Sequence, residues 1–96
     1  MEAKKRKFIR FRGAVQGVGF RYRASYAAQS AGATGWVRNE SDGSVTMEIQ
    51  GTQEQIRTVL QTIERGAYIH IRNIKSVDIP VKEDEREFSI RDGWWY

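Results

Sequence analysis

The order in which two periodicities alternate along these 96 residues constrains the fold more than any other feature. Apolar residues recur at every second position in some segments, which is typical of strands, and at helical spacing in two others. Strands are expected at residues 7–15, 34–39, 45–50, 74–81 and 88–91. Helices are expected over residues 21–31 and between Thr52 and Gly66. The order is therefore strand, helix, strand, strand, helix, strand, with one short strand added at the end.

Both expected helices carry an apolar stripe that a sheet must cover. The first stripe comprises Phe20, Ala24, Ala27, Ala28 and Ala31, and its small side chains permit a close approach to the sheet. The second helix begins with a capping box between Thr52 and Gln55. Two layers are the simplest arrangement that buries both stripes. We therefore predict an α+β fold, a ferredoxin-like βαββαβ sandwich with an antiparallel sheet and both helices on one face. Pro80 indicates that the fourth strand lies at a sheet edge or that Pro80 is near the end of that strand.

Length and composition predict one small domain over residues 1–96. We expect a basic arm at residues 1–6, an aromatic tail at residues 92–96 and a monomer. The chain has no cysteine, so disulfides and thiolate chemistry are excluded. The start of the sequence lacks a signal-peptide pattern, and no apolar stretch is long enough to span a membrane, so we expect a cytoplasmic protein. The net charge of +4 is modest and fits a solvated basic surface, with an anionic small molecule or a nucleic acid as the alternative partners.

The segment between the first strand and the first helix predicts an anion site. Gly17 and Gly19 let backbone N–H groups turn towards a ligand, and a helix N-terminus follows directly. Arg21 opposes the helix dipole at that N-terminus, which has no structural benefit, and its planar guanidinium suits phosphate oxygens. Phosphate or sulfate is expected to bind this loop.

The remaining residues restrict the chemistry of such a site. His70 is the only histidine and is read as structural, the acidic residues are scattered, and no spacing indicates a metal site. A reaction at the loop must therefore need little acid–base help. Acyl phosphates meet this condition, because their carboxylate departs without protonation, and the catalyst need only bind the phosphoryl group and orient a water molecule. Asn39, at the end of the second strand, is the candidate for orienting that water.

Two motifs of this chain resemble those of acylphosphatases. One is the segment Gly13–Arg21, and the other is Gly35–Asn39 followed by Asp42–Val45, within a resemblance that spans residues 7–91. The resemblance implies the ferredoxin-like fold, hydrolysis of small anionic acyl phosphates to carboxylate and phosphate, and no cofactor or metal. It also implies that Arg21 binds the phosphate and Asn39 orients the nucleophilic water. The implied backbone cradle comprises Gln16, Gly17, Val18, Gly19 and Phe20.

Other readings of the sequence stay open. The domain could bind anions or RNA without catalysis, although the Gly-Val-Gly-Phe sequence lies in a loop and not on a central strand, so we do not expect nucleic acid to bind. An acylphosphatase-like domain of a hydrogenase-maturation protein is disfavoured by the absence of cysteine. The tail at residues 92–96 either packs on the domain's own surface or lies near Arg21.

Overall fold

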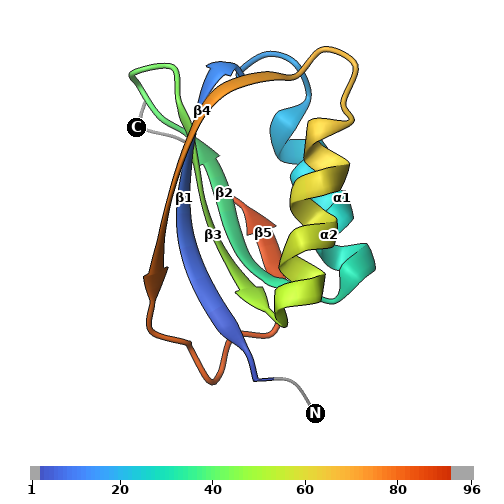
Figure 1. The fold of residues 1–96 in the computed structure, drawn as a ribbon, viewed down its shortest axis with the longest axis vertical. Helices are drawn as coiled ribbons and strands as arrows, with labels where there is room; N and C mark the ends of the chain where they lie inside the picture. The colour runs from blue at the N-terminus through green and yellow to red at the C-terminus, as the bar shows by residue number, and fades with distance from the viewer. Residues whose placement is uncertain (1–2, 92–96) are drawn as a thin grey trace.

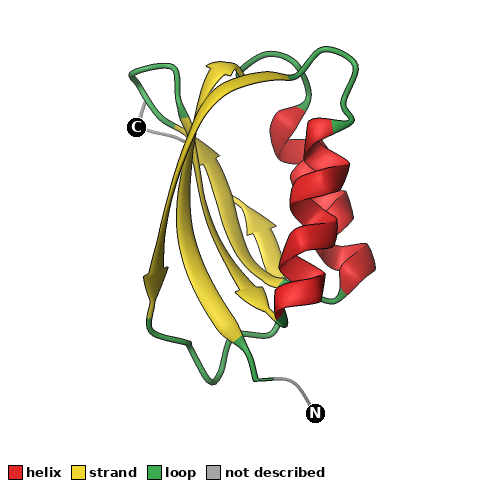
Figure 2. Ribbon diagram, in the orientation of Figure 1, coloured by secondary structure: helices red, strands yellow, loops and turns green. Residues whose placement is uncertain are grey.

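The structure is a computed structural model that describes residues 3–91 as one sheet with both helices against one face (Figures 1 and 2). The elements in chain order are β1 (Lys5–Ala14), α1 (Phe20–Ala31), β2 (Thr34–Asn39), β3 (Val45–Gly51), α2 (Gln53–Glu64), β4 (His70–Ile79) and β5 (Phe88–Ile90). The strand order is β4-β1-β3-β2-β5, antiparallel except for the parallel pair of β2 and β5. The predicted ferredoxin-like fold is confirmed. Neither helix within residues 3–91 is long and apolar enough to cross a membrane.

The core lies between the helices and one face of the sheet. The predicted stripe of α1 is buried at Phe20, Ala24, Ala27 and Ala28, with Ala31 at its margin. The small alanines bring α1 close to β2 and α2, and α2 contributes Ile56, Val59 and Ile63. Both predicted helix ends are confirmed, because Gly32 adopts a left-handed conformation after α1 and the capping box of Thr52 and Gln55 opens α2.

The strand predicted at residues 74–81 was misplaced. β4 runs from His70 to Ile79 and pairs with β1 over almost its whole length, so it begins earlier and ends before Pro80. The apolar alternation that suggested a buried face was misleading, since Val77 is 57% exposed and Val81 lies beyond the strand. Residues 70–73 place only one apolar side chain, Ile71, against the core, which is too little for an alternating pattern. The edge position that Pro80 indicated is confirmed.

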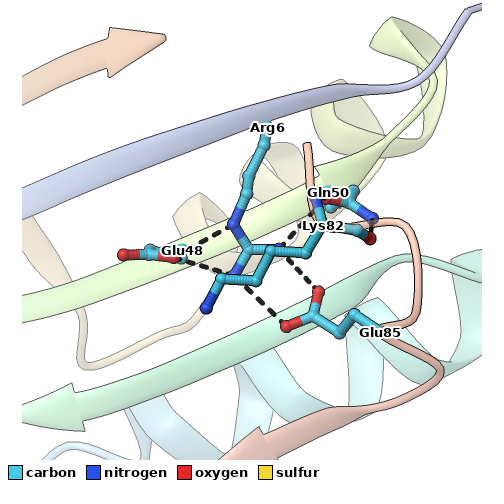
Figure 3. A network of polar contacts seen from close by, with 5 residues as sticks. All are labelled: Arg6, Glu48, Gln50, Lys82 and Glu85. Atoms are coloured by element: carbon cyan, nitrogen blue, oxygen red, sulfur yellow. Dashed lines mark hydrogen bonds and ion pairs between the residues drawn. The ribbon is translucent and has the colours of Figure 1, made fainter. Parts of the chain in front are cut away.

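The predicted basic arm at residues 1–6 also needs correction. β1 already begins at Lys5, and the side chain of Arg6 is fully buried. Its guanidinium donates hydrogen bonds to Glu48 on β3, at 2.8 and 3.0 Å, and to Glu85 in the loop after β4, at 2.7 and 3.2 Å (Figure 3). It also donates to Gln50 Oε1 at 3.1 Å. Arg6 is thus held in β1 by charge pairing with residues far along the chain, which the sequence pattern could not reveal.

The Arg6 cluster fastens the segment between β4 and β5 to the sheet. Gln50 extends it, since its amide donates to the carbonyl of Lys82 and accepts from the Lys82 N–H, both at 2.8 Å (Figure 3). Burial alone raises the pKa of Glu85, but hydrogen bonds from Arg6 and Thr34 and the charge of Arg6 outweigh it, so the pKa lies below its ordinary value. The segment that leads into β5 is therefore held by an ionised pair.

We predict that Arg6→Ala lowers the free energy of unfolding by about 3 kcal/mol, because it leaves two half-buried carboxylates and Gln50 without their donor. Lys7→Ala is the matched control one residue on, since Lys7 pairs with Asp78 at an exposed position. That change is expected to cost less than about 1 kcal/mol. Urea denaturation of the three proteins measures the difference, and equal losses would show that the buried cluster does not stabilise the fold.

Candidate active site

Two parts of the chain that are distant in sequence meet at one end of the molecule. One is the loop after β1 with the first turn of α1, and the other is the end of β2, and both lie at the upper end of Figure 1. Between them is a hollow of about 120 Å³. Its lining residues are Val15, Gly17, Gly19, Phe20, Arg21, Tyr22 and Asn39.

The loop that borders this hollow has a backbone with unpaired hydrogen-bond donors within residues 3–91. Gly17 and Gly19 have φ values of 74° and 80°, which a residue with a Cβ rarely adopts. Gly19 is also the N-cap of α1, and no side chain caps that end or places an acidic group in its first turn. Among residues 3–91, no hydrogen bond takes up the N–H groups of Gly17 to Tyr22. A row of free donors at a helix N-terminus is suited to an anion.

Arg21 and Asn39 face this hollow from two different elements. Arg21 lies in the first turn of α1, and Asn39 is the last residue of β2, paired with Val45 of β3. Both are partly exposed, and neither side chain makes a hydrogen bond or ion pair with another residue of the described range 3–91. The two side chains singled out from sequence are therefore brought together with their polar groups free.

Within the predicted cradle, the residues divide into two groups. Gly17, Gly19 and Phe20 line the hollow, whereas Gln16 and Val18 do not. Val18 packs against the core instead. The Phe20 ring is buried too, 4.9 Å from that of Phe11 between centroids, which anchors the start of α1 on β1. Phe20 can contribute only its backbone N–H to the hollow, because its ring is part of the core.

Gln16 has a positioning contact that the sequence did not reveal. Its side-chain amide donates to the carbonyls of Glu40 and Ser44, at 2.7 and 2.9 Å. These carbonyls belong to the turn between β2 and β3, directly after Asn39. The contact fixes the distance between the donor loop and the strand end that carries Asn39.

Ionised carboxylates stiffen the same turn. Burial alone raises the pKa of Glu40, but hydrogen bonds from Thr46 and Arg38 and the charge of Arg38 more than offset it, so this pKa lies below its usual value. Hydrogen bonds from the side chain and backbone N–H of Ser44, with a smaller effect of Arg12, lower the pKa of Asp42 to about 2. Both groups stay charged near neutral pH, and neither lines the hollow.

The hollow is suited to binding a tetrahedral anion and a water molecule. Backbone donors and the guanidinium of Arg21 can bind phosphoryl oxygens, while the neutral amide of Asn39 can both donate and accept. Within the described part of the chain, no cluster of three histidine or acidic side chains could hold a metal ion. Tyr22 also lines the hollow, and its position next to Arg21 in the first helical turn was the signal in the sequence that could have indicated it. The tail at residues 92–96 lies outside the described residues.

Comparison with known proteins agrees with this architecture. The family model described as Acylphosphatase matches residues 7–90. An acylphosphatase of Geobacillus kaustophilus is 39% identical over 90 residues, which cover 93% of this chain and 96% of that protein. The crystal structure of acylphosphatase from Bacillus subtilis is similar with a TM-score of 0.83 at 28% identity, covering 91% of this chain and 98% of that one. Full-length HypF, in a phosphate- and nucleotide-bound form, matches 97% of this chain with 12% of its own, at 25% identity and a TM-score of 0.84.

We predict that Gly17→Val and Gly19→Val each weaken the binding of inorganic phosphate about tenfold or more, because the loop can no longer direct its donors at the anion. A left-handed residue with a Cβ also costs roughly 1–2 kcal/mol of stability, which should leave the domain folded. Calorimetric titration with phosphate and thermal unfolding measure the two effects.

Gly32→Val is the matched control for the glycine variants. Gly32 has a φ of 83° at the opposite end of α1, so the same substitution introduces comparable backbone strain away from the hollow, together with a close contact to Gln55 Nε2 at 3.1 Å. We expect this variant to lose stability and to bind phosphate as the unmodified protein does. Normal phosphate binding by Gly17→Val and Gly19→Val would show that the loop only connects β1 to α1.

Proposed function

The chain belongs to the acylphosphatase family and is a hydrolase of acyl phosphates, and from this premise we propose that Arg21 and Asn39 carry the reaction on the backbone cradle. The observation that carries the proposal is their convergence on a hollow walled by free N–H groups, although they lie 18 residues apart on separate elements. A carboxylate or histidine is absent from the lining of this hollow.

The phosphoryl group is bound through charge-assisted hydrogen bonds. Its oxygens accept from the N–H groups of the loop and of the first turn of α1, where the helix dipole adds to the attraction. The guanidinium of Arg21 completes this set from the side with a bidentate contact. As charge shifts during the reaction, these donors stabilise it without reorganising, which is the main source of rate enhancement in such sites.

Asn39 orients the attacking water opposite the carboxyl leaving group. The water oxygen bonds to phosphorus while the bond between phosphorus and the carboxyl oxygen breaks, and that electron pair departs with the carboxylate. The water's proton passes to a phosphoryl oxygen of the substrate, so the products are carboxylate and dihydrogen phosphate. The leaving group needs no acid, and orientation of the water supplies the remaining advantage.

We predict that the purified protein hydrolyses acetyl phosphate and benzoyl phosphate, and that it does so undiminished in the presence of a chelator. Phosphate monoesters are expected to turn over poorly, because an alkoxide leaving group requires a general acid that the site lacks. Release of inorganic phosphate measures both. Comparable turnover of a monoester, or loss of activity with chelator, would contradict this mechanism.

Substitutions of Arg21 and Asn39 are expected to impair different kinetic properties. Arg21→Ala should lose phosphate binding and at least a hundredfold to a thousandfold in rate, corresponding to about 3 kcal/mol or more, and Arg21→Lys should recover little of it. Asn39→Ala should lower kcat while inorganic phosphate still inhibits competitively. Steady-state kinetics with phosphate as inhibitor separates the two effects.

Two exposed residues away from the hollow provide controls for the loss of an arginine charge and for the loss of an asparagine amide. Arg57 lies on α2 and Asn73 on β4, and neither lines the hollow. Arg57→Ala and Asn73→Ala are therefore expected to retain normal kinetics. If Arg21→Ala and Asn39→Ala lost phosphate binding equally, the division of roles would be wrong.

A further inference from the structure

The hollow is too small to enclose a whole acyl phosphate with a bulky acyl group. Its volume is about 120 Å³, whereas pockets that enclose drug-sized ligands measure roughly 300–1,000 Å³. A phosphoryl group and a water molecule occupy such a space. If the phosphoryl group binds there as proposed, a bulky acyl group must extend through the mouth and contact whatever side chain borders it.

Tyr22 is the one residue in the lining that offers exposed apolar surface. Val15 and Phe20 are 1% and 2% exposed and face the core, the two glycines have no side chain, and Arg21 and Asn39 are polar. Tyr22 is 74% exposed. Side chains in an α-helix tilt towards its N-terminus, so a ring in the first turn of α1 leans towards the donor loop.

An exposed aromatic ring beside a reaction site can contribute to substrate binding. It can stack on a flat or apolar acyl group and remove both surfaces from water. No hydrogen bond within residues 3–91 engages its hydroxyl, so the ring is not held by a structural contact of that kind. Its neighbour on the same helical face, Tyr26, is 75% exposed and does not line the hollow.

We propose that Tyr22 is the acyl-binding residue of this enzyme, and that it selects acyl phosphates whose acyl group is aromatic or bulky and apolar over acetyl phosphate. This inference rests on the proposed function, because it takes the phosphoryl group to bind at the loop. The contact lies away from the reacting atoms, so it acts on substrate binding and appears in KM more than in kcat.

The test compares benzoyl phosphate with acetyl phosphate. The unmodified protein should have the lower KM for benzoyl phosphate. Tyr22→Ala should raise that KM roughly threefold to tenfold, the range of one aromatic contact, and should raise the KM for acetyl phosphate less. Tyr22→Phe should keep the preference, because the ring and not the hydroxyl makes the contact.

Tyr26→Ala is the matched control, with the same residue type, helix and exposure one turn further from the loop. It should leave the ratio of the two KM values as it is in the unmodified protein. The role of Tyr22 would be overturned if the ratio of the two KM values were unchanged in Tyr22→Ala, or if Tyr26→Ala changed that ratio equally. Either result would leave acyl phosphate hydrolysis intact. An unmodified protein that hydrolyses neither substrate would overturn the proposed function and this inference together.

Discussion

The left-handed backbone at Gly17 and Gly19 is the constraint on which the site and the packing of α1 both depend. The chain leaves β1, an inner strand of the sheet, at Ala14 and must enter α1 at Phe20. The φ values of 74° and 80° make that reversal possible without strain in glycine. The same turn directs Phe20 onto Phe11 and starts the alanine stripe against the sheet, so local conformation, core packing and the proposed anion site share one origin.

A second set of contacts fixes Asn39 relative to that loop. The strand end that carries Asn39 is held by its pairing with β3, and the turn beyond it is tied by ionised carboxylates and by the side chain of Gln16. The hydrogen bonds from Gln16 join the donor loop to this turn directly. The two elements that cooperate in the proposed mechanism are thus positioned by short polar contacts, which tolerate little displacement.

Much of the fold follows from the sequence because periodicity and caps are local properties. The helix stripes, the capping box at Thr52 and the edge strand next to Pro80 are visible in the residues themselves. β4 was placed too late because its first residues carry only one core-facing apolar side chain, Ile71, and so show no alternation. Arg6 was taken for part of a basic arm because its partners lie 42 and 79 residues away. The meeting of Arg21 and Asn39 at one hollow was predictable from motif and chemistry. Tyr22 was passed over although it stands next to Arg21, and only the Gln16 contact required the spatial arrangement.

The most direct test of the proposed phosphate cradle is to titrate the folded protein with inorganic phosphate and to record a two-dimensional amide NMR spectrum at each step. The account predicts that the backbone amides of residues 17–22 shift together, along with the side-chain N–H groups of Arg21 and Asn39, and with one common dissociation constant. The open face of the sheet also carries arginines, among them Arg10 and Arg38, which stack on Phe8 and Trp36. Shifts confined to that face, or no shifts at residues 17–22, would contradict the account.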